Sequence, residues 1–190
     1  MGYTLDYLVA ELPCGRCGAV SAADASLEMT TRLRDDPQLA YLGVGDELPG
    51  DTARALAGGY LLLHEPAPGG PIVLLHRWTC PACGYAYNWA EVVVTGGVIT
   101  SIRAVDLNQA ALARAHFIVD DARDIAADLA GVRSSLDLDS DQVVQILRER
   151  VPTDGGWRRS TRTAYTSPIW RARGCAWSMA SPGCASMATC

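Results

Sequence analysis

Two C-x-x-C-G units constrain this chain more than any other feature of its sequence. One unit lies near the amino terminus and the other in the middle; together they contain Cys14, Cys17, Gly18, Cys80, Cys83 and Gly84. A C-x-x-C turn presents two thiolates at adjacent vertices of a tetrahedron, so two such turns complete a four-sulfur metal site. The glycine after each pair permits the unusual φ angle that a sharp bend there needs. The four cysteines therefore predict one structural Zn²⁺.

This pattern resembles the zinc ribbon, whose two knuckles sit at the tips of β-hairpins. The resemblance covers the two knuckles and the strands beside them, and it implies a closed site that clamps an antiparallel sheet. The 62 residues between Cys17 and Cys80 exceed the roughly 15–20 of compact zinc sites. We therefore expect a ribbon that carries a long insertion.

Two other interpretations of these residues stay open at the level of sequence. The segment from Trp78 to Cys83 has the look of a thioredoxin-type redox turn after a strand, although the residues that follow favour a strand over the helix that such chemistry needs. His76 lies four residues before Cys80 and is a candidate to replace a thiolate, but a histidine on a strand near a knuckle more often packs beside the site.

Length and composition indicate a globular body. The chain has 190 residues, of which 49% are hydrophobic and 19% charged, enough to bury a core without disulfides. Its net charge of −5 gives no general attraction to phosphate backbones. No apolar run approaches the roughly 18 residues of a membrane span, and the first thirty residues lack the pattern of a secretion signal. We expect a cytoplasmic protein with no membrane partner.

Charge divides the chain into two parts. Residues 1–156 hold all 21 acidic residues and 11 arginines, a net charge of −10, whereas residues 157–190 hold five arginines and no acid. We expect a domain over residues 1–152 and an irregular or disordered basic tail over residues 153–190. The tail holds three more cysteines and a set of cationic and aromatic residues suited to phosphates and bases. The cysteines are Cys175, Cys184 and Cys190, and the candidate nucleic-acid-binding residues are Arg158, Arg159, Arg162, Trp170 and Arg171.

Period-two alternation and turn residues predict the strands. We expect an amino-terminal strand over residues 1–12 and a hairpin of residues 60–64 with 72–78. A second hairpin of residues 85–94 with 98–105 turns at two glycines.

Apolar spacings of three, four and seven predict a helix from Asp106 to Gly131, and Asp139 with Gln142 forms the capping box of another helix. The expected fold is α+β, with an antiparallel sheet of hairpins clamped by zinc and covered by the long helix.

A closed metal site and an acidic body favour recognition over chemistry. The sequence contains no serine-nucleophile motif, phosphate loop or dinucleotide fingerprint. We therefore expect a zinc-stabilised, non-catalytic binding or adaptor protein whose partner is another protein. The alternative is a nucleic-acid-binding zinc-ribbon protein that uses the arginine and aromatic residues of the tail. A thiol redox protein is the third interpretation.

Overall fold

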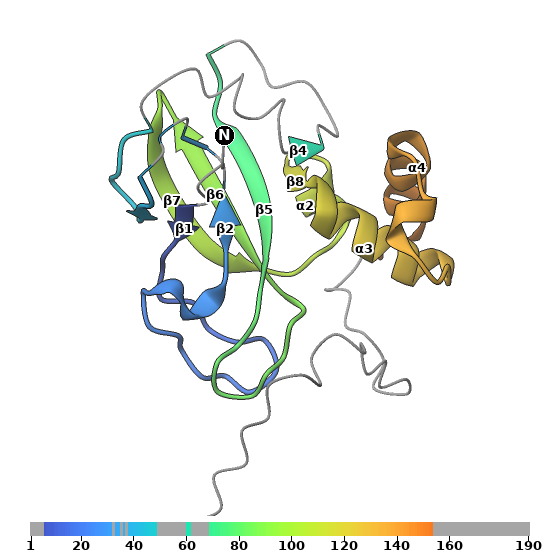
Figure 1. Ribbon diagram of the computed structural model, residues 1–190, viewed down its shortest axis with the longest axis horizontal. Helices are drawn as coiled ribbons and strands as arrows, with labels where there is room; N and C mark the ends of the chain where they lie inside the picture. The colour runs from blue at the N-terminus through green and yellow to red at the C-terminus, as the bar shows by residue number, and fades with distance from the viewer. Residues whose placement is uncertain are drawn as a thin grey trace, which may run out of the picture. The chain divides into compact units, whose positions relative to one another are not determined.

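A five-stranded mixed sheet organises the described part of the chain (Figure 1). The computed structural model describes residues 6–31, 33–34, 36, 38–48, 60–61 and 69–153, all within one compact unit, residues 1–159. The strand order of the large sheet is β4-β8-β5-β6-β7, and a small sheet has the order β2-β1-β3. The strands are β1 Asp6–Leu8, β2 Thr30–Thr31, β3 Tyr41–Leu42, β4 Tyr60–Leu61, β5 Ile72–Trp78, β6 Asn88–Thr95, β7 Val98–Val105 and β8 His116–Ile118.

Helices follow mainly in the second half of this unit. The α-helices are α2 Gln109–Leu112, α3 Val119–Ala130 and α4 Ser140–Arg150, and the 3-10 turns are η1 Ala25–Leu27 and η2 Ser135–Asp137. Figure 1 shows α3 and α4 side by side. Among the residues that the structure describes, no helix has the length and apolar character to cross a membrane. The predicted α+β class is confirmed.

Strand β5 separates two hydrophobic cores. Leu74 belongs to a core shared with the β1 region, whereas Leu75 belongs to a core shared with the helices. Because successive side chains of a strand point to opposite faces, β5 is buried on both sides, which explains its nearly continuous apolar sequence. The amino-terminal segment covers one face of the sheet, and α2, α3 and α4 cover the other.

The predicted hairpin of β6 and β7 is confirmed. The two strands pair from Trp89 with Val105 to Thr95 with Val98, and the two-residue turn uses Gly96 at φ 59° and Gly97 at φ 81°. Positive φ at both positions gives the turn the twist that antiparallel strands need. The strand β6 begins later than predicted, because residues 85–87 complete the turn that follows the second cysteine pair.

The other predicted hairpin is wrong. Strand β4 pairs with β8, and β8 in turn pairs in parallel with β5, so β4 and β5 are not neighbours. The connection between them contains three prolines, Pro66, Pro68 and Pro71, which cannot donate a backbone hydrogen bond to a strand ladder. The sheet is therefore mixed, in place of the purely antiparallel sheet that we expected.

The single long helix from Asp106 to Gly131 is also wrong. It is interrupted by β8, because His116–Ile118 fills the position between β4 and β5. Aromatic and β-branched residues suit that central position, and pairing with the sheet outweighs the helical spacing of the flanking residues. The predicted end is confirmed, since α3 stops at Ala130 and Gly131 follows at φ 72°.

The helix at the end of the described region matches its prediction. Asp139 caps α4, and the reciprocal bonds between Asp139 and Gln142 form the expected capping box. Val143 and Leu147 are buried against the helical core.

Two further expectations fall wholly or partly outside the described residues. The amino-terminal strand is described from Asp6 and ends at Leu8, where we expected residues 1–12. The domain boundary near residue 152 stays a prediction, because the description stops at Thr153.

Ion pairs between acidic side chains and arginines join the sheet to the helical layer. Glu91 of β6 is 3% exposed and accepts hydrogen bonds from Nε of Arg103 at 2.8 Å and Nε of Arg114 at 2.8 Å. Arg77 of β5 pairs with Asp121 of α3 at 3.0 Å. Burying a carboxylate is costly unless it is paired, so these arginines join the sheet to the residues after α2 and to α3.

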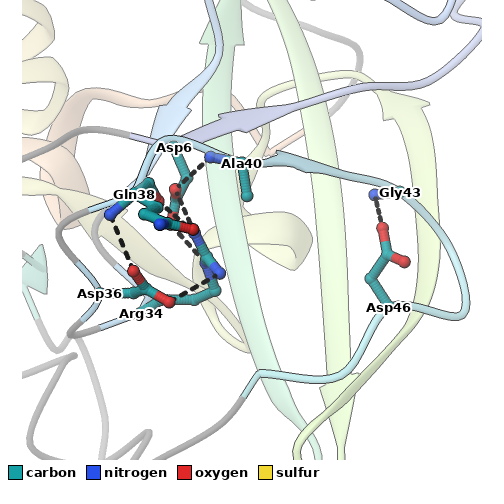
Figure 2. Close-up of polar contacts among 7 residues, drawn as sticks. All are labelled: Asp6, Arg34, Asp36, Gln38, Ala40, Gly43 and Asp46. Carbon is teal, nitrogen blue, oxygen red and sulfur yellow. Dashed lines mark hydrogen bonds and ion pairs between the residues drawn. The ribbon is translucent and has the colours of Figure 1, made fainter.

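A second buried carboxylate anchors the small sheet (Figure 2). Asp6 of β1 is 1% exposed. Its two oxygens accept from Nε and Nη2 of Arg34 at 2.9 and 3.0 Å, and Oδ1 also accepts from the Ala40 N–H at 2.8 Å. Arg34 further contacts the half-exposed Asp36 at 3.4 Å and donates to the Gln38 carbonyl. Asp6 therefore fixes the chain that leads into β3.

We predict that Asp6→Ala lowers the free energy of unfolding by about 3 kcal/mol, since it leaves the Arg34 guanidinium buried without its main partner. Asp36→Ala is the matched control: it removes a carboxylate from the same arginine, but one that is 39% exposed, so its loss is about 1 kcal/mol or less. Denaturant titration of both variants measures the difference. Equal losses would show that burial of the Asp6 pair does not matter.

Candidate metal centre

The first cysteine pair lies at the tip of a short antiparallel excursion. Pro13 bridges to Val20, and the Cys14 N–H donates to the Ala19 carbonyl at 2.9 Å. The Gly18 N–H returns to the Cys14 carbonyl at 3.0 Å, with Gly18 at φ 73°. That φ angle favours glycine. Backbone hydrogen bonds and the glycine conformation therefore fix the turn that carries Cys14 and Cys17.

The second pair repeats this geometry between β5 and β6. The Cys80 N–H donates to the Tyr85 carbonyl at 2.9 Å, and the Gly84 N–H donates to the Cys80 carbonyl at 2.8 Å. Gly84 adopts φ 67°. The same hydrogen bonds and the same glycine conformation thus form at both turns, as their shared C-x-x-C-G sequence predicts.

The fold brings the four sulfurs of the two pairs together. The ligand atoms of Cys14, Cys17, Cys80 and Cys83 all lie within 4.8 Å of one another. Sγ of Cys14 lies 3.8 Å from Sγ of Cys83, and Sγ of Cys17 lies 3.8 Å from Sγ of Cys80. These separations are far longer than the roughly 2.05 Å of a disulfide. They match the edge of a tetrahedron with metal–sulfur bonds of about 2.3 Å, which is about 3.8 Å long.

The first cysteine of each pair is buried and the second is exposed. Cys14 is 3% exposed and Cys80 is 2% exposed, and both belong to the core that packs on the β1 side of the sheet. Cys17 and Cys83 face solvent. Each pair therefore spans the boundary between the core and the surface, so the cluster closes one end of that core.

The thiols differ in their tendency to ionise. Burial acts to raise the pKa of Cys14, but hydrogen bonds from the backbone N–H groups of Cys17 and Arg16 and from neighbouring thiols outweigh it and lower the pKa to about 6. The Tyr85 N–H acts to lower the pKa of Cys83, but desolvation and the other three sulfurs raise it to about 12. A metal that binds at this cluster would displace the proton of Cys83, so the affinity of the cluster for the metal would rise with pH.

The surroundings of the second pair do not match a redox turn. Such chemistry places the attacking cysteine at a helix amino terminus, which lowers its pKa. Here residues 81–83 form a turn and the chain continues into β6. The alternative ligand His76 is not a member of the four-residue cluster. It lies in β5 with no exposed surface.

Sequence analysis missed one residue at this centre, Asn88. It is 6% exposed at the start of β6, and its Oδ1 accepts from the Gly15 N–H at 3.0 Å while its Nδ2 donates to the Tyr85 carbonyl at 2.9 Å. Asn88 thereby joins the two cysteine turns. An asparagine inside a predicted strand is unfavourable and therefore indicated a special role for Asn88. Nothing in the sequence indicated that its partner is the distant Gly15 N–H.

The remaining predicted site residues lie outside the described residues. They are the candidate nucleic-acid contacts Arg158, Arg159, Arg162, Trp170 and Arg171, together with Cys175, Cys184 and Cys190. Comparison of the chain with protein-family models, with curated proteins and with solved structures finds no match. The resemblance to zinc ribbons therefore rests on the two turns alone, and no family is assigned.

Burial of His76 predicts a pH dependence of stability. Burial lowers the pKa of His76 from 6.5 to about 3. Between these two pH values His76 is protonated in the unfolded chain but neutral in the folded protein. Stability present above pH 6.5 is thus lost as the pH falls towards 3, by about 1.4 kcal/mol at pH 5.5. Denaturant titrations of the zinc-saturated protein and a His76→Gln variant at pH 7.5 and 5.5 measure this loss. Between pH 7.5 and 5.5, the free energy of unfolding should fall by about 1.4 kcal/mol less in the variant than in the wild-type protein. An equal fall in both proteins would show that burial of His76 is not the cause.

Proposed function

We propose that this chain is a zinc-stabilised, non-catalytic binding protein. The observation that carries the proposal is the convergence of four sulfurs from two identical turns. One tetrahedral Zn²⁺ with Cys14, Cys17, Cys80 and Cys83 as ligands would satisfy all four thiolates. With every vertex taken by sulfur, the ion has no position for water or substrate, which suits a structural role.

The chemistry of the donors supports zinc among divalent metals. Four thiolates in a tetrahedron suit zinc or iron, whereas magnesium and calcium require oxygen ligands. The ion would join segments 63 residues apart in the sequence. In small peptides such a site contributes about 10–16 kcal/mol, comparable with the roughly 5–15 kcal/mol net stability of a whole domain.

We predict that the full chain binds one zinc ion and that Cys14→Ser loses it. Removing one thiolate leaves an incomplete site, so the variant should melt at least roughly 10 °C lower. Cys184→Ser is the matched control, because it removes a thiol that belongs to neither C-x-x-C-G unit. Native mass spectrometry gives the metal count, and thermal unfolding gives the stability.

Two results would contradict the zinc proposal. A Cys14→Ser protein with unchanged metal content and melting temperature would exclude the four-sulfur site. A mass and a visible absorption that correspond to an iron–thiolate centre would keep the site but exclude zinc.

An exposed apolar segment that includes β3 supports a protein as the partner. Leu39, Tyr41 and Val44 are 47%, 58% and 62% exposed, and β3 lies at an edge of the small sheet. The Tyr41 ring stacks on Tyr7 with centroids 5.9 Å apart, which holds it in place. Adjacent exposed apolar side chains often mark protein contacts. We call residues 39–44 the recognition segment.

We predict that a photo-crosslinking amino acid at Tyr41 captures another protein in an extract of the native cells. The matched control is the same amino acid at Leu136, which is 83% exposed but is not part of the recognition segment. Mass spectrometry of the crosslinked products compares the two positions. Equal labelling at both, or crosslinks to nucleic acid in place of protein, would contradict the proposed role of this segment.

A further inference from the structure

We propose that Asn88 is a positioning residue that sets the distance between the two halves of the metal site. This inference rests on the proposed zinc centre and adds a function for a side chain that is not a ligand. Its carboxamide has hydrogen bonds to both cysteine turns: to Gly15 in the first and to Tyr85 in the second.

The bonds form a continuous chain between the turns. The Gly15 N–H donates to Oδ1 of Asn88 at 3.0 Å, and Nδ2 of Asn88 donates to the Tyr85 carbonyl at 2.9 Å. The same carbonyl accepts from the N–H of the ligand Cys80 at 2.9 Å. Since Gly15 directly follows the ligand Cys14, three hydrogen bonds connect the backbones of the two buried ligands.

The chemistry of this position requires an amide. Gly15 offers a donor and the Tyr85 carbonyl is an acceptor, so the bridging group has to accept at one end and donate at the other. An aspartate would set oxygen against oxygen at Tyr85. An apolar residue would make neither hydrogen bond, so it would remove the connection between the two turns.

Asn88 is itself held by the sheet. It pairs with Trp78 at the end of the β5–β6 ladder and is 6% exposed. Because Asn88 belongs to the paired strand β6, its hydrogen bond to Gly15 holds the first cysteine turn at a fixed distance from that strand. Groups that orient metal ligands in this way typically alter metal affinity by roughly tenfold to a hundredfold when they are removed.

The test measures zinc affinity of the full chain by competition with a chromophoric chelator. We expect Asn88→Ala to weaken zinc binding by roughly tenfold to a hundredfold. Asn88→Leu should weaken it similarly, because it restores volume but neither hydrogen bond. Asn108→Ala is the matched control: Asn108 caps α2 through the Ala111 N–H at 2.9 Å, so the change should cost stability while zinc affinity stays at the wild-type value.

A second readout separates positioning from general loss of structure. Co²⁺ in place of zinc reports the geometry of a thiolate site through its visible absorption, so we expect a changed spectrum in Asn88→Ala and an unchanged one in Asn108→Ala. Wild-type affinity in Asn88→Ala or Asn88→Leu would overturn the proposal. If the Asn88 variants keep wild-type affinity while Cys14→Ser abolishes zinc binding in the same assay, the positioning role of Asn88 is wrong and the zinc site stands. A wild-type chain that binds no zinc would overturn both proposals.

Discussion

The convergence of two cysteine turns is the constraint on which the rest of the structure depends. Each turn forms locally, through hydrogen bonds between neighbours and a glycine with positive φ, but these local bonds do not bring the two turns together. A shared metal would hold both turns together at the edge of the core. Because Cys14 and Cys80 are both part of that core, closing the site also brings the amino-terminal segment onto the sheet.

Local structure could be predicted from the sequence where a few neighbouring residues determine it. The Gly96–Gly97 turn, the capping box at Asp139 and the end of α3 before Gly131 all depend on φ angles or hydrogen bonds within four residues. The placement of β8 could not, because its helix-compatible spacing is overridden by a position between β4 and β5. The same long-range pairing makes the sheet mixed.

The candidate site shows the same division. The grouping of the four cysteines followed from their spacing, because tetrahedral coordination requires pairs of ligands at fixed separations. Asn88 could not be found in this way. Its importance lies in two hydrogen bonds, one of them to Gly15, 73 residues away in the sequence. An asparagine has no fixed spacing from a partner that is a backbone group, so only the fold reveals the connection.

The two proposed roles of the molecule are physically linked. Strand β1 pairs with both β2 and β3 and leads into the first cysteine turn, while Asp6 within it holds the backbone at Ala40. The recognition segment is therefore supported by a strand from which the chain continues into the first cysteine turn. A ligand that binds only the folded arrangement stabilises it by mass action, so zinc would favour the conformation that presents Tyr41. Equilibrium linkage then requires the reverse, that a partner bound at this segment strengthens zinc binding. The metal would thus contribute to recognition without contacting the partner.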